Sequence, residues 1–360
     1  MKNPVYPSID RIEMSPGPKS AGSDRFVLSL DGGGMRGIIS TAVLEEFTDV
    51  LRSMGFDRPV GETFDMVAGT STGGLIACAL TCPSILGAGQ DGKPGLVSLH
   101  KLASVYLEHG DEIFADPVHG IRSTFTDKYS VENLERLLMG WYGAARFSDC
   151  VLPTLIMGYD VTEGTPFPMA STQNTDMATW EVCRCTSAAP TYFAPFNHEG
   201  HLIVDGGVVA NNPSLYAYQY ARSMWPDCRR IHILSVGTSS AVYRYKSMAS
   251  YGISSWTGVH KVFASAQMQT VDETMQFIPD ALYTRIYREL DSEIEMDDAS
   301  EASLRTLQDF GRELGREFRP QLEQFARALV ASKSPEPSVP QEISAGKPGL
   351  WARLRSWLGK

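Results

Sequence analysis

The segment from Gly69 to Gly73 constrains this chain most, because its sequence is Gly-Thr-Ser-Thr-Gly between an apolar segment and a helical pattern. Residues 63–68 have the composition of a buried strand, and residues 74–80 continue as an apolar helix. A GxSxG motif in this context is typical of a nucleophile elbow, in which the two glycines permit a turn that projects the serine hydroxyl. We therefore predict that Ser71 is a nucleophile; the alternative is a serine that only caps the helix.

A similar strand, loop and helix precede this motif. Residues 26–30 are an apolar run, a glycine loop follows, and residues 38–51 have a helical pattern. Repeated units of this kind indicate a parallel sheet covered by helices, so we predict an α/β fold, a three-layer α/β/α sandwich with a mainly parallel central sheet. Further strands are predicted at 152–159, 201–205 and 231–236, and further helices at 98–108, 131–142, 213–224 and within 298–331.

The glycine loop contains three consecutive glycines, Gly32, Gly33 and Gly34, between the first strand and its helix. Glycines let successive N–H groups point at one place, which suits an oxyanion hole near a helix N-terminus. With Gly37, the loop also satisfies the GxGxxG pattern of dinucleotide sites. That alternative requires a second strand ending in an acidic residue about 20 positions on. Residues 49–62 are instead charged and interrupted by proline and glycine.

An activated serine needs a base, and the best candidate is Asp205. It ends an apolar strand and is followed by Gly206 and Gly207, so a glycine turn can hold its carboxylate near Ser71. A strand-end aspartate with a purely structural role is the alternative. The sequence thus predicts a Ser71–Asp205 dyad.

A Ser-Asp-His triad would add a histidine after position 205, which leaves His232 and His260. His232 lies in the middle of a predicted strand, where a buried, hydrogen-bonded histidine is the expected role. His260 lies in a stretch of helical character without a glycine loop. We therefore favour the dyad over the triad.

The charge balance argues against a nucleic-acid polymer as partner. The net charge is −10 and the pI is about 5.3, whereas phosphate backbones require clustered Lys and Arg. No apolar run approaches the roughly 20 residues of a spanning helix, and the first residues lack the features of a signal peptide. These features favour a soluble, cytoplasmic protein.

Cysteines and histidines suggest no metal or cofactor. The six cysteines form no CxxC pair and are predicted to be free core thiols. His198 and His201 form an HxxH in a turn-like segment without further ligands, so a polar loop is favoured over a zinc site. The acidic run 291–298 lacks the alternating pattern of a calcium loop and is predicted to start a helix.

Composition divides the chain into four predicted segments. Residues 1–24 are rich in Pro, Ser and Gly and predicted to be poorly ordered, 25–331 form the domain, and 332–348 are a Pro/Ser-rich linker. Residues 349–360 place Leu and Trp on one helical face beside basic residues. Such an amphipathic helix suits an anionic bilayer, or packs on its own domain or a second subunit.

Taken together, the motifs resemble the patatin-like phospholipases. The resemblance extends over roughly residues 25–320, in the same order and spacing. It is carried by residues 29–39, 64–74, 185–193 and 204–213.

The resemblance implies a lipid acyl hydrolase in which Ser71 attacks an ester carbonyl and Asp205 accepts its proton. The N–H groups of Gly33 and Gly34 would hold the oxyanion, and Arg36 would brace the loop or add positive potential; a solvent-facing arginine is the alternative. The resemblance implies that calcium is not needed for the chemistry.

The resemblance also implies a phospholipid membrane surface as partner, with peripheral association at the inner membrane face. Compact bacterial members include phospholipases activated by cyclic nucleotides in antiphage defence, so a cyclic-nucleotide activator is a further option, and a homo-oligomer is left open. The alternatives are a triad esterase acting on small soluble esters and a non-catalytic nucleotide-binding or scaffold protein.

Overall fold

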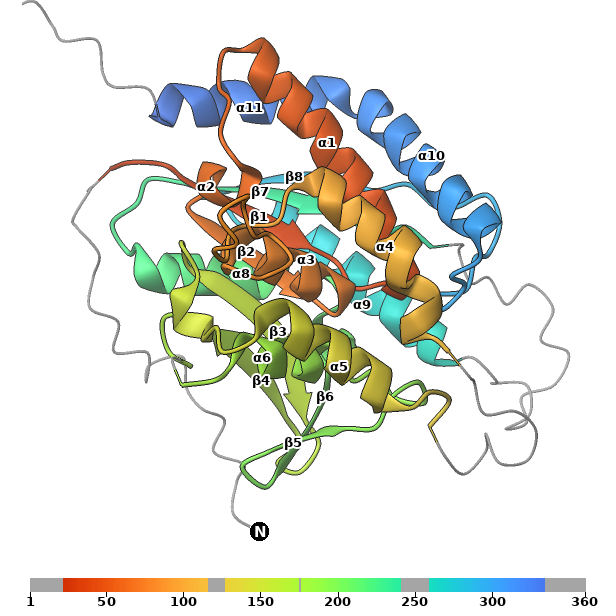
Figure 1. The fold of residues 1–360 in the computed structure, drawn as a ribbon. Coiled ribbons are helices and arrows are strands. Elements are labelled where there is room, and N and C mark those ends of the chain that lie inside the picture. Colours follow the sequence, from red (N-terminus) through yellow and green to blue (C-terminus); the bar gives the residue numbers. More distant parts are fainter. Residues whose placement is uncertain (1–21, 116–126, 175, 241–258, 334–360) are drawn as a thin grey trace, which may run out of the picture.

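A computed structural model describes residues 22–115, 127–174, 176–240 and 259–333 of the chain. Its centre is one eight-stranded sheet with the strand order β5-β6-β3-β2-β1-β7-β8, while β4 pairs with β3 off this path (Figure 1). The pairs β3–β2–β1–β7–β8 are all parallel, and β4, β5 and β6 add antiparallel pairs at one end. The predicted α/β class with a mainly parallel sheet is confirmed.

The bounds of the elements follow the chain. The strands are β1 (Arg25–Leu30), β2 (Met66–Thr70), β3 (Thr154–Asp160), β4 (Thr165–Ala170), β5 (Phe196–His198), β6 (His201–Asp205), β7 (Ile231–Val236) and β8 (Ala281–Ile286). The α-helices are α1 (Gly37–Ser53), α2 (Val60–Thr63), α3 (Thr72–Thr81), α4 (Leu99–Ile113), α5 (Val131–Tyr142), α6 (Thr179–Thr186), α7 (Gly207–Ala210), α8 (Ser214–Met224), α9 (Val259–Gln276), α10 (Glu301–Glu317) and α11 (Arg319–Lys333).

Two hydrophobic cores lie on opposite faces of the sheet. Side chains alternate along a strand, so Phe26, Leu28 and Leu30 of β1 enter one core and Val27 enters the other. The first core packs against α1, α3, α4, α5, α6, α10 and α11, and the second packs against α8 and α9 (Figure 1). These layers are the predicted three-layer sandwich.

Strand β3 brings the ends of two other strands together. Met157 of β3 lies opposite Thr70 of β2, and the next residue, Gly158, lies opposite Asp205 of β6. Since β4 occupies the other edge of β3, β2 and β6 share one edge. Strand β2 runs parallel to β3 and strand β6 runs antiparallel to it. The carboxyl ends of β2 and β6 therefore point toward each other. The residue after Thr70 therefore lies beside Asp205.

The sequence missed the short or irregular elements. All five predicted strands and the predicted helices occur within a few residues of their expected bounds, whereas β4, β5, β8 and α6 were not predicted. The prediction that 291–298 starts a helix is wrong, because α10 begins at Glu301, where the Ser300 hydroxyl caps it. The strand predicted at 63–68 also starts later than expected, since residues 60–63 form α2 and β2 begins at Met66.

Parts of the predicted segments lie outside the described residues. These are residues 1–21, most of the linker and the whole amphipathic segment 349–360, while α11 continues to Lys333. The domain boundaries therefore stay predictions. Within the described ranges, no helix has the length and apolar character needed to cross a membrane.

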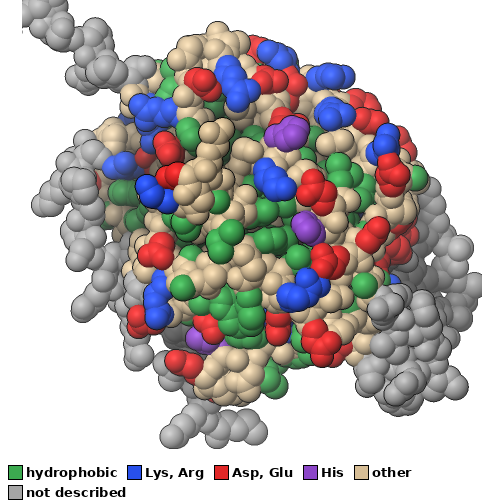
Figure 2. All heavy atoms as spheres, viewed as in Figure 1, with side chains coloured by type: hydrophobic (Ala, Val, Ile, Leu, Met, Phe, Trp, Pro, Cys, Tyr) green, Lys and Arg blue, Asp and Glu red, His purple; other side chains and the backbone are tan. Residues whose placement is uncertain are grey.

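The face that carries α4 and α5 has the mixed polar and apolar surface expected of amphipathic helices. Lys and Arg are interspersed there with Asp and Glu, and apolar side chains are visible between them (Figure 2). The mixture fits the pattern of surface helices that bury one stripe and expose the rest.

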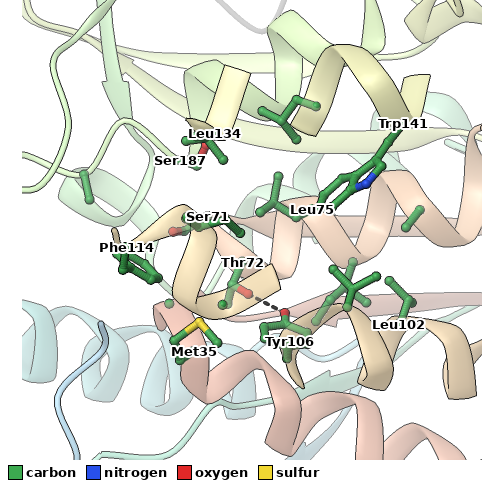
Figure 3. A pocket seen from close by; sticks show the side chains of 18 of the residues that line it. Met35, Ser71, Thr72, Leu75, Leu102, Tyr106, Phe114, Leu134, Trp141 and Ser187 are labelled. Carbon is green, nitrogen blue, oxygen red and sulfur yellow. Dashed lines mark hydrogen bonds between the residues drawn. The ribbon is translucent and has the colours of Figure 1, made fainter. Parts of the chain in front are cut away.

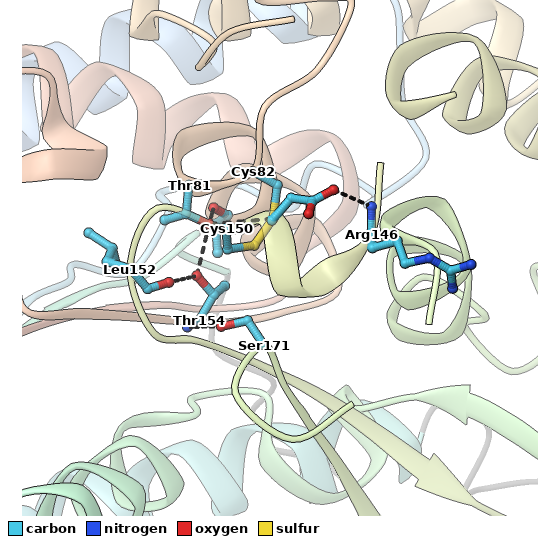
Figure 4. The surroundings of a disulfide bond; sticks show 9 residues. Thr81, Cys82, Arg146, Cys150, Leu152, Thr154 and Ser171 are labelled. Atoms are coloured by element: carbon cyan, nitrogen blue, oxygen red, sulfur yellow. Dashed lines mark hydrogen bonds between the residues drawn. A yellow bond between two sulfur atoms is a disulfide. The ribbon is translucent and has the colours of Figure 1, made fainter. Parts of the chain in front are cut away.

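A disulfide joins Cys82, which follows α3, to Cys150, which precedes β3 (Figure 4). The prediction of six free thiols is therefore wrong for this pair; the other four cysteines are free and buried. Sequence spacing gave no sign of the pairing, because the two cysteines are 68 residues apart and meet only when β3 lies beside β2.

We predict that replacing both Cys82 and Cys150 with serine lowers the free energy of unfolding by about 2–4 kcal/mol, because the cross-link restricts the unfolded chain. Denaturant unfolding of the oxidised protein and the double variant measures the difference. A reductant should lower the melting temperature of the parent protein and leave that of the double variant unchanged. A parent protein insensitive to reductant, with six titratable thiols after unfolding, would contradict the cross-link.

Candidate active site

Ser71 occupies a strained turn between β2 and α3. Its φ is 54° and its ψ −127°, a conformation that residues other than glycine rarely adopt. Gly69 and Gly73 make the turn possible: a Cβ on Gly69 would lie 2.2 Å from the Gly73 carbonyl oxygen, and one on Gly73 would lie 2.3 Å from the Leu30 oxygen. The local geometry is that of the nucleophile elbow predicted from the motif.

The side chain of Thr186 stabilises the turn through two hydrogen bonds. The N–H of Ser71 donates to Thr186 Oγ1 over 2.8 Å, and that hydroxyl donates to the carbonyl of Met157 over 2.6 Å. All three groups are buried, so the hydroxyl ties the elbow to β3 where β2 ends. The sequence reasoning gave Thr186 no role; its place in a family-like segment was the only signal.

We predict that Thr186→Val lowers the free energy of unfolding by about 1–3 kcal/mol, because it leaves the buried Ser71 N–H without an acceptor. The turnover number should fall about tenfold or more as the elbow shifts. Thr179→Val is the matched control, since the Thr179 hydroxyl is buried without a hydrogen-bond partner in the described chain. Denaturant unfolding and ester hydrolysis measure both effects, and equal losses in the two variants would contradict this role.

Asp205 lies beside Ser71 and is almost wholly buried. Its carboxylate accepts a hydrogen bond over 2.7 Å from the N–H of Gly207, and the Ser71 hydroxyl lies near enough to influence it. Burial raises the pKa of Asp205 to about 6, and the Ser71 hydroxyl and the Gly207 N–H offset part of that rise. Gly206 is needed for the turn because a Cβ there would lie 2.3 Å from the Met157 carbonyl oxygen.

The glycine loop passes over Ser71 and offers two amides. A Cβ on Gly32 would lie 3.1 Å from the Ser71 Cβ. The N–H of Gly32 donates to the Asn211 carbonyl over 3.0 Å, so it is not available to a substrate. For the N–H groups of Gly33 and Gly34, no acceptor occurs within the described ranges. Of the three glycines predicted to form the oxyanion hole, Gly32 is therefore excluded as a donor, and Gly33 and Gly34 stay candidates.

The segment before α10 closes over the glycine loop. The N–H of Met35 donates to the Met296 carbonyl over 2.8 Å, and a Cβ on Gly34 would lie 2.1 Å from that oxygen. Gly34 has a φ of 59°, so both its backbone and its surroundings require glycine. The acidic run 291–298 thus contributes to the site without being a helix.

Behind the loop, Asp31 is buried and anchored by Arg285 of β8. The guanidinium donates to both carboxylate oxygens, over 2.9 and 2.6 Å. Burial raises the pKa of Asp31 to about 6 although the pairing with Arg285 opposes this rise. The pair fixes the start of the glycine loop to the sheet. No sequence motif pointed to Arg285, which lies in an unpredicted strand.

Arg36 is partly buried and lines a cleft beside Ser71. Its Nε is buried and has no hydrogen-bond partner among the residues that the structure describes. Burial lowers the pKa of the guanidinium, while Tyr287 and Glu295 nearby act in the opposite direction. Arg36 is therefore not a solvent-facing arginine.

A narrow apolar cavity of about 90 Å³ starts at Ser71 and follows α3 between α4 and α5 (Figure 3). Tyr106 in its wall bonds to the hydroxyl of Thr72 over 2.5 Å. The lining is almost entirely apolar and includes Met35, Leu75, Ile76, Ala79, Leu102, Phe114, Leu134, Leu138 and Trp141. Such a cavity fits a hydrocarbon chain.

A wider cleft of about 490 Å³ adjoins the other side of Ser71. It contains Asp205 and Arg36, and its walls include Glu293 and Glu295. Ser71 and Met296 line both spaces, so the hydroxyl lies at the junction between an apolar cavity and a polar cleft.

Among the residues that the structure describes, no histidine takes part in this arrangement. His232 stacks on Phe26 at 4.4 Å and bonds to Asp24 over 3.0 Å, near the amino ends of the parallel strands. Ser71 follows the carboxyl end of β2, so it lies at the opposite end of the parallel strands. His260 lies in α9, and its side chain is outside the described residues. Neither space beside Ser71 has a histidine among its described lining residues.

The two histidines of the HxxH segment lie opposite each other in the β5–β6 pair. His201 bonds to Asp160 over 2.7 Å, and His198 lies in β5. The part of the chain described by the structure contains no group of three His, Cys, Asp or Glu side chains that could hold a metal ion.

An α/β sheet with an elbow serine, a buried carboxylate beside it and loop amides that point to the site is the architecture of an acyl ester hydrolase. Residues 28–218 match the family model described as patatin-like phospholipase. The chain belongs to this family, and it is accordingly a lipid acyl hydrolase that cleaves carboxylic esters.

Sequences of known relatives align with most of the chain. Patatin-like protein 1 of Arabidopsis thaliana is 29% identical over 82% of this chain and 83% of its own length. Patatin-17 of Solanum cardiophyllum is 27% identical over 80% of this chain and 83% of its own. Among solved structures, VipD from Legionella pneumophila aligns at a TM-score of 0.40 and 12% identity, covering 87% of this chain and 72% of that one.

Proposed function

We propose that the chain hydrolyses glycerophospholipids of membranes through a Ser71–Asp205 dyad and an acyl-enzyme. The position of the Ser71 hydroxyl beside the Asp205 carboxylate, at the junction of the apolar cavity and the polar cleft, carries the proposal. An acyl chain would occupy the cavity while the rest of the lipid lies in the cleft, which places the ester carbonyl at Ser71.

The proposed reaction has two steps. Ser71 Oγ attacks the ester carbonyl as its proton passes to Asp205, and the amides of Gly33 and Gly34 stabilise the oxyanion. The alcohol leaves with the proton from Asp205. Water, deprotonated by Asp205, then attacks the acyl carbon; the ester bond to Ser71 breaks as Asp205 returns the proton to Ser71 Oγ, and the fatty acid is released. The absence of histidine from the described lining of both spaces supports a carboxylate base over a triad.

Contact with a bilayer is part of the proposal. Val208 and Phe263 line the polar cleft and are 49% and 67% exposed, so the cleft has exposed apolar side chains in its lining. Exposed apolar side chains in the lining of a cleft, here Val208 and Phe263, favour peripheral contact with lipid. Activation by a cyclic nucleotide and a role in antiphage defence stay predictions from the resemblance, and hydrolysis rates with and without added cyclic nucleotides test the former.

Mass spectrometry of products tests the proposed substrate class. The purified protein should release fatty acid and lysophospholipid from phospholipid in detergent micelles. Acetyl esters should react at least about tenfold more slowly than long-chain esters of the same alcohol, because they leave the apolar cavity empty. Hydrolysis confined to small soluble esters would instead favour the esterase alternative.

A further inference from the structure

The apolar cavity beside Ser71 follows one face of α3. Its lining residues on that helix are spaced three and four positions apart, which places them on a single face. They are Thr72, Leu75, Ile76 and Ala79. The lining stops at Ala79, although the helix continues to Thr81. The cavity therefore runs from the elbow along α3 and ends near the carboxyl end of that helix.

Helix α4 forms a second wall and runs beside α3 in the opposite direction. Near Ser71, the hydroxyl of Tyr106 in α4 bonds to the hydroxyl of Thr72 over 2.5 Å. At the other end, Val97 lies just before α4 and donates its N–H to the Ala79 carbonyl over 3.0 Å. The two hydrogen bonds fix which part of α4 lies at each end of the cavity.

Helix α5 forms the third wall, and its first residues lie at the Ser71 end. Just before this helix, the N–H of Tyr129 donates over 2.9 Å to the carbonyl of Tyr192, which lines both spaces beside Ser71. At the other end of α5, the Trp141 carbonyl accepts from the N–H of Ile85 over 2.7 Å. Since Ile85 follows the carboxyl end of α3, Trp141 lies at the far end of the cavity.

The loop after α3 closes this far end. It supplies Leu86 to the lining, together with Trp141 from α5 (Figure 3). The hydrogen bond from Ile85 joins the loop to α5, and the Cys82–Cys150 disulfide joins its start to the segment before β3. The loop is thus held against both helices, and Leu86 forms the end wall opposite Ser71.

The length of α3 limits how much of an acyl chain the cavity accepts. Ala79 follows Ser71 by eight positions, which at 1.5 Å per residue span about 12 Å. An extended hydrocarbon advances roughly 1.25 Å per carbon, because its C–C bonds of about 1.5 Å are staggered at near-tetrahedral angles. The cavity therefore has room for about ten carbons.

From these positions we propose that the cavity measures the length of the acyl chain, with Ala79 and Leu86 setting the limit at about ten carbons. The inference rests on the proposed function, because it concerns the acyl chain of the ester that Ser71 attacks. Each methylene inside the cavity leaves water and adds to binding. A carbon beyond the limit meets the end wall, so longer chains are cleaved but gain no further rate.

Nitrophenyl esters of straight saturated acids measure this limit, from butanoyl to tetradecanoyl, each below the concentration at which it aggregates. In the parent protein, kcat/KM should rise about two- to fourfold with each methylene up to about ten carbons and then stop rising. A profile without such a break would overturn the length limit. Failure to hydrolyse any ester or phospholipid would overturn the proposed function as well.

Two substitutions should move the break in opposite directions. Ala79→Leu extends a side chain into the far end of the cavity and should move the break to shorter chains by about two or three carbons. Leu86→Ala removes the same group from the end wall and should move it to longer chains by a similar amount. A general loss of stability cannot produce both shifts, because it lowers the rates on all esters together.

Leu96→Ala is the matched control, because it makes the same change in the same loop outside the cavity. Leu96 is not among the lining residues, and its side chain lies 3.5 Å from the position of a Cβ on Gly61. The control should keep the break of the parent protein. A break that neither Ala79→Leu nor Leu86→Ala moves, or that Leu96→Ala moves as far, would overturn the length limit and leave the hydrolase function intact.

Discussion

Ser71→Ala is expected to reduce ester hydrolysis by a factor of about 10³ to 10⁶, the range found when a hydrolase loses its nucleophile. The variant removes the only atom that can form the acyl-enzyme and leaves the loop amides in place. Initial rates on a long-chain ester measure the loss. A fluorophosphonate probe should label the parent protein at Ser71 and fail to label the variant.

The control for Ser71→Ala is Ser171→Ala, which removes another buried serine hydroxyl, one that accepts from the Thr154 N–H away from the cleft. It should retain activity and probe labelling. Because Ser71 has a positive φ, Ser71→Gly should be more stable than Ser71→Ala by roughly 1 kcal/mol, and equally inactive. Substantial activity in both Ser71 variants would eliminate the acyl-enzyme mechanism.

Motifs revealed the site because they encode local backbone geometry. Glycine is required around Ser71 and at Gly34 because a Cβ there would clash with backbone, and at Gly32 and Gly33 because it would clash with side chains; such needs are visible in a sequence. Long apolar runs likewise revealed the five main strands. Both kinds of signal depend on neighbours in the chain.

Contacts between distant segments left no such signal. Thr186 supports Ser71 from 115 residues away, and Arg285 anchors Asp31 across 254 residues. Each of these contacts depends on which strands lie side by side, and no local sequence pattern specifies that arrangement. The same reason explains the Cys82–Cys150 pair. The run 291–298 misled the prediction because acidic residues are favourable at a helix start, whereas here they precede the helix and border the cleft.

Asp205→Asn is expected to lower kcat/KM by a factor of about 10² to 10⁴, because the amide cannot accept the Ser71 proton. Asp160→Asn is the matched control: Asp160 is also buried in β3 but bonds to His201. In the parent protein, kcat/KM should rise with pH through about 6, where Asp205 ionises, and level off above it. A flat profile between pH 5 and 8 would argue against Asp205 as the base.

The same substitution should stabilise the fold at neutral pH. Burial raises the pKa of Asp205 to about 6 from an ordinary value of 3.8, so the native state binds a proton more tightly than the unfolded state does. The stability associated with that proton is fully present below pH of about 4 and is lost as the pH rises through 6. Asparagine has no charge to bury, so at pH 8 the variant should exceed the parent protein in free energy of unfolding by roughly 1–3 kcal/mol. This difference in free energy of unfolding should disappear below pH of about 4. If the variant is no more stable than the parent protein at pH 8, burial of the Asp205 carboxylate does not lower the stability of the fold.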